Sequence, residues 1–153
     1  MYIWEYTEQF MIEAEIDSPN SKGYGKWIKY IHSADEIDDF VDENIIAESE
    51  YGKARKEIVK NNLMEIDYQE HQVAVAYFGL QPSCPFVYNL EVISDTRVEL
   101  QLINGETMSD AESAPAVIVL MPIDKTYDIT LTEKMISTQE HLERLQKQDY
   151  IKF

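Results

Sequence analysis

Apolar residues occupy the even positions along residues 2–16, and only Glu8 interrupts this set. The apolar positions of this segment are Tyr2, Trp4, Tyr6, Phe10, Ile12, Ala14 and Ile16. A period of two is typical of a strand with one buried face. A loop rich in turn-forming residues follows over residues 17–25, and residues 26–31 again have a strand pattern. The sequence therefore predicts a hairpin formed by residues 2–16 and 26–31.

Helical signals begin at Ser33. Ser33 and Glu36 have the spacing of a capping box, in which each side chain bonds the other residue's backbone N–H. A helix is predicted to follow, because the next apolar residues recur at helical spacing. These residues are Ile37, Phe40, Val41 and Ile45. A second, short helix is predicted around residues 53–60, ended by Asn61 and Asn62.

Strand patterns dominate after residue 63. The predicted strands cover residues 71–78, 86–94, 97–103, 116–121 and 127–131, and residues 94–96 form a hairpin turn. Residues 116–121 are apolar on both parities, which predicts a central strand. A second capping box at residues 137–140 predicts a short terminal helix with Leu142 and Leu145 on one face. This order predicts a single α+β domain over residues 1–153, with a mostly antiparallel sheet.

The charge of the chain narrows the possible partners. The 153 residues include 29 acids and 13 bases, which gives a net charge of −16. A protein that binds nucleic acid directly needs a basic face, so direct nucleic-acid binding is disfavoured. Contact with an anionic membrane is disfavoured for the same reason. No run of apolar residues is long enough to span a membrane, and the first residues lack the pattern of an export signal. We expect a cytoplasmic protein.

Residues with catalytic or metal-binding chemistry are sparse. His32, His71 and His141 do not have metal-ligand spacing, and Cys84 has no second cysteine for a disulfide. Gly-rich phosphate loops and nucleophile motifs are absent from the sequence. We therefore interpret Cys84 as a half-buried loop residue, and we expect no catalytic residue, no metal and no cofactor. The protein is predicted not to be an enzyme.

Acidic residues are concentrated between positions 35 and 50, where there is no Lys or Arg. They are Asp35, Glu36, Asp38, Asp39, Asp42, Glu43, Glu48 and Glu50. The calcium-loop pattern is absent, so two interpretations stay open: a solvated helix face that favours solubility, or a docking surface for a basic partner. The size of the net charge favours the docking interpretation, because solubility requires a net charge of only about 2–8 in a small domain. The predicted contact residues are Asp35, Asp38, Asp39, Asp42 and Glu43, flanked by Tyr30 and Tyr51.

Residues 63–131 resemble the C-terminal domain of bacterial protease-complex accessory subunits of the PrcB type. The resemblance lies in Ile66-Asp67-Tyr68, the strand 73–79 that ends in Gly, the loop Pro82-Ser83-Cys84 and the Pro-bounded strand 115–122. Pro85-Phe86-Val87 replaces the glycines that usually follow the small loop, and the usual export signal is lacking. The resemblance implies a β-rich, non-catalytic binding domain.

Three functions follow from these observations. The first is an acidic inhibitor or toxin-immunity protein that neutralises a basic protein partner, such as a toxin or nuclease, after electrostatically steered encounter. The second is an accessory subunit of a larger protein complex, as the resemblance implies. The third is a phage-type inhibitor that mimics nucleic acid and occupies a DNA-binding channel.

Overall fold

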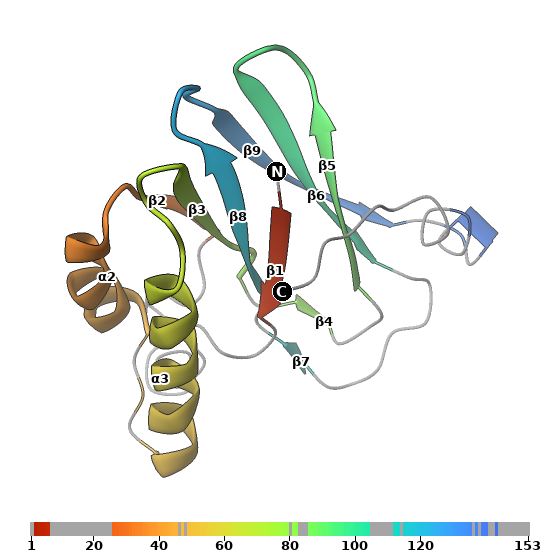
Figure 1. Ribbon diagram of the computed structural model, residues 1–153. Helices are drawn as coiled ribbons and strands as arrows, with labels where there is room; N and C mark the ends of the chain where they lie inside the picture. The colour runs from red at the N-terminus through yellow and green to blue at the C-terminus, as the bar shows by residue number, and fades with distance from the viewer. Residues whose placement is uncertain are drawn as a thin grey trace.

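The computed structural model describes residues 2–6, 26–45, 47, 49–79, 81–82, 86–104, 112–113, 115–135, 137, 139–140 and 143. The strands are β1 (Tyr2–Tyr6), β2 (Trp27–Ile31), β3 (His71–Tyr77), β4 (Gln81–Pro82), β5 (Phe86–Val92), β6 (Arg97–Asn104), β7 (Glu112–Ser113), β8 (Ala116–Pro122) and β9 (Asp128–Met135) (Figure 1). The helical elements are the 3₁₀-helix η2 (Ala34–Glu36) and the α-helices α2 (Ile37–Asn44) and α3 (Glu50–Met64). The fold is α+β, as predicted.

Two sheets form most of the fold. The four-stranded sheet has the order β1-β8-β3-β2, and all its pairs are antiparallel. The three-stranded sheet has the order β5-β6-β9. Its β5–β6 pair is the predicted antiparallel hairpin, whereas β6 and β9 run parallel. The short strands β4 and β7 pair separately.

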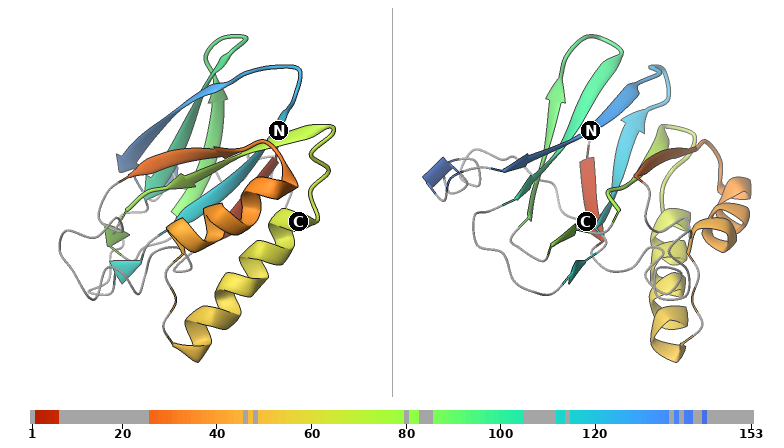
Figure 2. Two further views of the ribbon diagram at one scale, coloured as in Figure 1. Left: turned by 90° about the vertical axis from the view of Figure 1, so that its left-hand side faces the viewer. Right: turned by 180° about the vertical axis from the view of Figure 1, so that it is seen from behind.

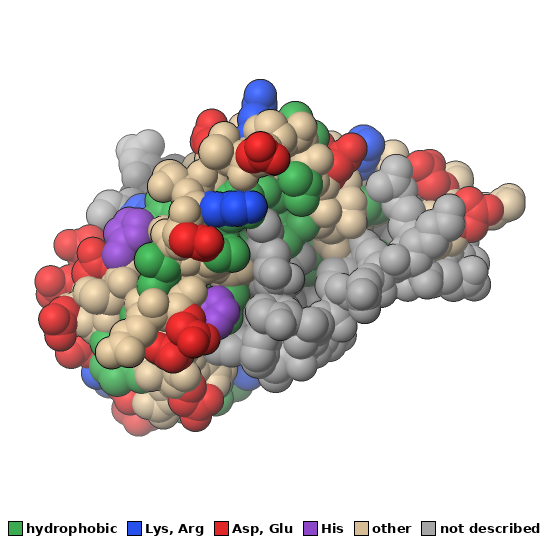
Figure 3. All heavy atoms as spheres, turned by 45° about the horizontal axis from the view of Figure 1, so that its top comes forward, with side chains coloured by type: hydrophobic (Ala, Val, Ile, Leu, Met, Phe, Trp, Pro, Cys, Tyr) green, Lys and Arg blue, Asp and Glu red, His purple; other side chains and the backbone are tan. Residues whose placement is uncertain are grey.

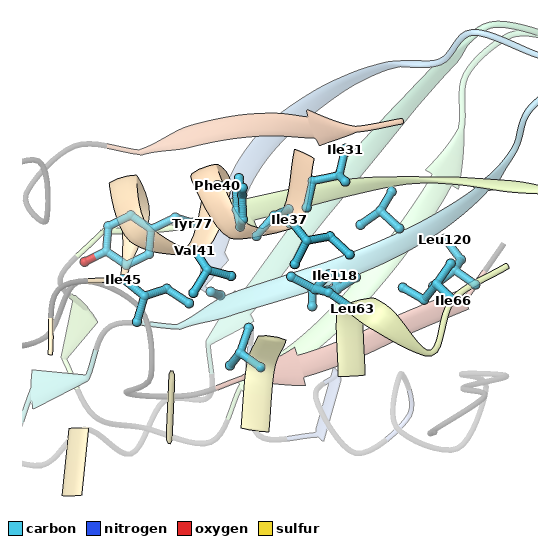
Figure 4. Close-up of a cluster of buried hydrophobic side chains, with 14 residues drawn as sticks. Ile31, Ile37, Phe40, Val41, Ile45, Leu63, Ile66, Tyr77, Ile118 and Leu120 are labelled. Atoms are coloured by element: carbon cyan, nitrogen blue, oxygen red, sulfur yellow. The ribbon is translucent and has the colours of Figure 1, made fainter. Parts of the chain in front are cut away.

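The four-stranded sheet is the middle of three layers. The helices α2 and α3 lie on one side of it and the three-stranded sheet lies on the other (Figure 2). The helix-side core contains Ile37, Phe40 and Val41 of α2 together with residues of β2, β3 and β8 (Figure 4). The sheet-side core contains Ala74, Ala76, Phe78, Tyr88, Val98, Leu100, Leu102, Val117, Val119, Met121 and Ile129.

This layering explains why β3 and β8 are apolar on both parities. Val75 and Ile118 belong to the helix-side core, whereas their neighbours Ala74 and Val119 belong to the sheet-side core. Alternate side chains of a strand point to opposite faces, so the part of a strand that is covered on both faces has apolar residues on both parities. The predicted central position of residues 116–121 is confirmed, since β8 lies between β1 and β3.

The predicted hairpin between the first two strands is wrong. β1 pairs with β8 and β2 pairs with β3, so β1 and β2 lie at opposite edges of the four-stranded sheet. The alternating pattern specifies a strand but not its partner. The two strands pair instead with the central strands β8 and β3, which have buried residues on both faces. Residues 7–16 of the predicted first strand lie outside the described residues.

The second helix is longer than predicted at both ends. α3 begins after Ser49, whose Oγ accepts a hydrogen bond from the N–H of Gly52 at 3.0 Å. It passes through Asn61 and Asn62, the residues predicted to end it, and continues to Met64. The buried side chain of Leu63 lies beyond these asparagines, so packing against the sheet outweighs their weak helix propensity.

The capping-box predictions are supported at both sites. The carboxylate of Glu36 accepts a hydrogen bond from the N–H of Ser33 at 3.2 Å, and the backbone of Ser33 is extended. Near the end of the chain, Ser137 Oγ accepts from the N–H of Glu140 at 3.1 Å. Leu142 and Leu145 of the predicted terminal helix lie outside the described residues.

Candidate docking surface

The outward side of η2 and α2 carries the predicted contact acids. Ile37, Phe40 and Val41 are buried against the four-stranded sheet, so the opposite side of the helix faces solvent. The exposed acids on that side are Asp35, Asp38, Asp39, Asp42 and Glu43. Figure 3 shows the acidic side chains gathered at its left, the side on which α2 lies in Figure 1.

Two of these acids form ion pairs with α3. Lys60 Nζ lies 2.8 Å from Asp38 Oδ1, and Lys56 Nζ lies 3.1 Å from Asp42 Oδ1. The hydrogen bond and the charge of Asp38 raise the pKa of the Lys60 ammonium above its ordinary value. Part of the acidic cluster is therefore neutralised, although residues 35–50 contain no Lys or Arg. The bases come from the next helix, which lies antiparallel beside α2.

The other three acids form a stripe along the helix. Asp35, Asp39 and Glu43 recur every four residues and are exposed. Asp39 and Glu43, both in α2, are separated by a helical rise of about 6 Å, and Asp35 precedes them in η2. Within the described part of the chain, these three carboxylates form no ion pair. We call Asp35, Asp39 and Glu43 the acidic stripe.

The structure does not bring Tyr30 to the acidic stripe. In β2, Trp27 and Ile31 belong to the helix-side core, whereas Ile28 packs into the sheet-side core. Tyr30 has the parity of Ile28 and therefore lies on the face away from α2. Its hydroxyl donates to the backbone oxygen of Tyr127 at 3.3 Å, on the side of the three-stranded sheet.

Tyr51 lies in the first turn of α3 and is 69% exposed. The Nε of Arg55 donates to the Tyr51 hydroxyl at 3.1 Å, and the guanidinium lies 5.2 Å from the ring centroid. Arg55 therefore places a positive charge directly beside Tyr51. An anchor at Tyr51 would present an aromatic ring and a cation to a partner, unlike the acidic stripe.

Lys29 and Asn44 fix the position of α2 and were missed by the sequence analysis. Lys29 Nζ donates to Asn44 Oδ1 and lies 4.7 Å from the ring centroid of Trp27. Asn44 is only 1% exposed, and its Nδ2 donates to the backbone oxygen of Phe40 at 2.8 Å. The burial of Asn44 could have been inferred from its spacing, because Asn44 falls where the apolar stripe of α2 would place another buried residue.

Other chemistry is limited among the residues the structure describes. They contain no group of three or more His, Cys, Asp or Glu side chains arranged to hold a metal ion. His32 is exposed, with its ring 6.4 Å from that of Tyr30, and Cys84 and His141 lie outside the described residues. Across the described ranges, no helix has the length and apolar character needed to cross a membrane. The chain matches no model of a known protein family, no curated protein and no solved structure.

Proposed function

We propose that the protein is a non-enzymatic acidic binding protein that neutralises a basic protein partner, in the manner of an inhibitor or toxin-immunity protein. The observation that carries the proposal is the acidic stripe. Among the described residues, the ion pairs with α3 leave three exposed carboxylates in a row along η2 and α2, in a chain with net charge −16.

The energetics of the stripe favour a cationic partner. Like charges four residues apart on a helix destabilise it by a few tenths of a kcal/mol per pair. Lys or Arg side chains of a partner would relieve this repulsion. The large negative charge of the whole chain would also steer a basic protein toward it and raise the association rate.

The rigidity of α2 also supports a docking role. Its apolar side is packed into the helix-side core, and the bond between Lys29 and Asn44 fixes its C-terminal end on β2. The pairs Asp38–Lys60 and Asp42–Lys56 hold it against α3. A surface that is already ordered loses little conformational entropy on binding.

The partner is best sought among basic proteins encoded beside the gene, by co-purification with this chain. The association rate is then measured between about 50 and 300 mM salt, where screening changes strongly. Charge reversal of the stripe (Asp35→Lys, Asp39→Lys, Glu43→Lys) should lower the rate at least tenfold at low salt. Asp38 and Asp42 are left unchanged, because a lysine there would face Lys60 or Lys56.

The matched control reverses three exposed acids away from the stripe: Glu65→Lys, Glu70→Lys and Asp124→Lys. It changes the net charge by the same +6, so a smaller loss of rate than in the stripe variant assigns the contact to α2. Equal losses would show that only total charge matters. An unchanged rate in both variants would contradict the proposal and leave the stripe as a solvated helix face.

A further inference from the structure

Among the described residues, the edge strand β5 has backbone groups at its C-terminal end that no other strand pairs with. The N–H of Ile93 donates to the backbone oxygen of Arg97 at 2.9 Å, which sets the alternation along the β5–β6 ladder. Residues in phase with Ile93, such as Glu91, direct their backbone groups toward β6. Leu90 and Val92 direct theirs away from it. Among the described residues, no backbone group pairs with Leu90 or Val92 on that side.

The edges of β2 and β9 are protected in ways that this end of β5 is not. Lys26 and Glu133 form an ion pair beside them, and the Tyr30 hydroxyl bonds the backbone oxygen of Tyr127. β2 also carries a lysine, a residue that discourages edge pairing. Residues 90–93 contain neither lysine nor proline. Figure 1 shows β5 on the outer side of the three-stranded sheet, away from α2 and α3.

Side chains at this end suit an added strand. Val92 is 65% exposed and Ile93 is 50% exposed, and the two lie on opposite faces of the strand. Adjacent aliphatic surface on both faces of an open edge is unusual for a strand that stays solvated.

The outer face next to this edge is acidic. Glu91 is directly opposite Glu99 in the β5–β6 register. Both carboxylates accept hydrogen bonds from the single Nε2 of Gln101, at 2.8 and 2.6 Å. Arg97 lies on the same face, but its register partner on β9 is another acid, Asp128.

We infer that the β5 edge at Leu90–Val92 accepts an extended segment of a partner protein as an additional strand, with aliphatic residues on the Val92 face and Lys or Arg on the Glu91 face. Backbone hydrogen bonds supply the attachment and the alternating side chains supply the selectivity. A second copy of this chain suits the edge poorly, because pairing would juxtapose two chains of net charge −16. The inference concerns a surface separate from the acidic stripe and does not depend on it.

The test uses a synthetic peptide, acetyl-Val-Lys-Val-Lys-Val-Lys-Val-amide, and amide hydrogen exchange followed by NMR. Binding should slow exchange of the Leu90 and Val92 amides at least tenfold and leave the already bonded Ile93 amide nearly unchanged. A peptide with Glu in place of each Lys should give no protection. Protection of these amides at high protein concentration without peptide would indicate self-pairing and overturn the inference.

Three variants separate edge pairing from general electrostatic attraction. Val92→Pro removes the outward N–H without removing a β5–β6 bond, so it should abolish peptide protection of Leu90. Val92→Thr keeps the N–H and should retain binding, and protection of Ile93 reports whether the hairpin is intact. Glu91→Gln should weaken binding severalfold and reduce its salt dependence.

The stripe variant described above should bind the peptide at β5 as the wild type does, because the two surfaces are separate. If the peptide protects only α2 amides, or binds Val92→Pro as tightly as Val92→Thr, the inference is wrong even if the docking role of the stripe is correct.

Discussion

The two sheets differ in how many of their faces are committed to the core. The four-stranded sheet contributes one face to the helix-side core and the other to the sheet-side core. The three-stranded sheet contributes Val98, Leu100 and Leu102 to the sheet-side core, while its other face carries the network around Gln101. The first sheet is therefore insulated by both neighbouring layers. The outer face of the second sheet combines this polar network with one buried apolar pair, Val87 and Ile103, and β5 is an edge strand among the described residues.

The network around Gln101 shows how polar groups are accommodated on that face. Gln101 is 1% exposed, and it accepts a hydrogen bond from Asn89 while donating to Glu91 and Glu99. Buried amides are tolerated when their hydrogen bonds are made. The three-stranded sheet therefore combines apolar packing on its inner face with a shared amide donor on its outer face.

The largest expected effect is a cavity in the insulated sheet. Ile118 lies on β8 and is fully buried, so Ile118→Ala should lower the free energy of unfolding by about 2–5 kcal/mol. Val92→Ala, at the exposed end of β5, should change it by about 0.5 kcal/mol or less. Urea unfolding of both variants measures the difference. Equal losses would contradict the distinction between the sheets.

A smaller effect is expected from the polar network. Gln101→Glu removes the shared donor and adds a third carboxylate, which should lower the free energy of unfolding by about 1–3 kcal/mol at pH 7. Gln101→Leu, which removes the donor without adding a charge, serves as the control and should lower the free energy of unfolding less. Urea midpoints of both variants at pH 7 measure the difference, and equal losses would mean that the added charge has no effect.

Serine side chains allow a further comparison between a helix start and a hairpin turn. Ser49→Ala removes the N-cap of α3 and should lower the free energy of unfolding by about 0.5–2 kcal/mol, whereas Ser49→Asp should retain most of it. Ser94 Oγ accepts from the N–H of Arg97 at 3.1 Å in the exposed turn of the β5–β6 hairpin. Ser94→Ala should have the smaller effect, and thermal unfolding can test this ranking.

The smallest expected effect is a change in the pH dependence of stability above pH 9, caused by Tyr68. Burial, with a lesser contribution from the charge of Glu36, raises the pKa of Tyr68 above its ordinary value of 10.0. Its hydroxyl donates to the backbone oxygen of Leu63 at 2.9 Å. Tyr68 therefore contributes its full stability below pH 10, and the contribution is lost as the pH rises, because the unfolded state releases the proton first.

The free energy of unfolding of Tyr68→Phe should accordingly fall less steeply between pH 9 and 11 than that of the wild type. The difference in slope should correspond to at most one proton released on unfolding. Urea midpoints over that range, read by circular dichroism, provide the measurement. Parallel curves for the two proteins would mean that Tyr68 ionises equally easily in the folded and unfolded states.

Much of the candidate surface could be predicted from local sequence. The capping box at Ser33 and the spacing of Ile37, Phe40 and Val41 are local signals, and they correctly place the acids on the outward side of α2. The roles of Lys56 and Lys60 could not be predicted in this way. They depend on α3 lying antiparallel to α2, which is decided by the packing of both helices on one sheet.

Tyr30 illustrates the same limit within a strand. Its alternation with Ile31 could be predicted, but which parity faces α2 depends on the side of the sheet that the helix covers. A shift of one position would have put Tyr30 beside the acids.

The sequence by itself determined the α+β class, the positions of most strands, and the central place of residues 116–121, because periodicity and capping act over a few neighbouring residues. Only the tertiary structure decided that β1 pairs with β8, that β9 runs parallel to β6, and that Asp38 and Asp42 pair with lysines of α3. Those outcomes join residues distant in the chain. They follow from the joint burial of several apolar faces, which no single segment specifies.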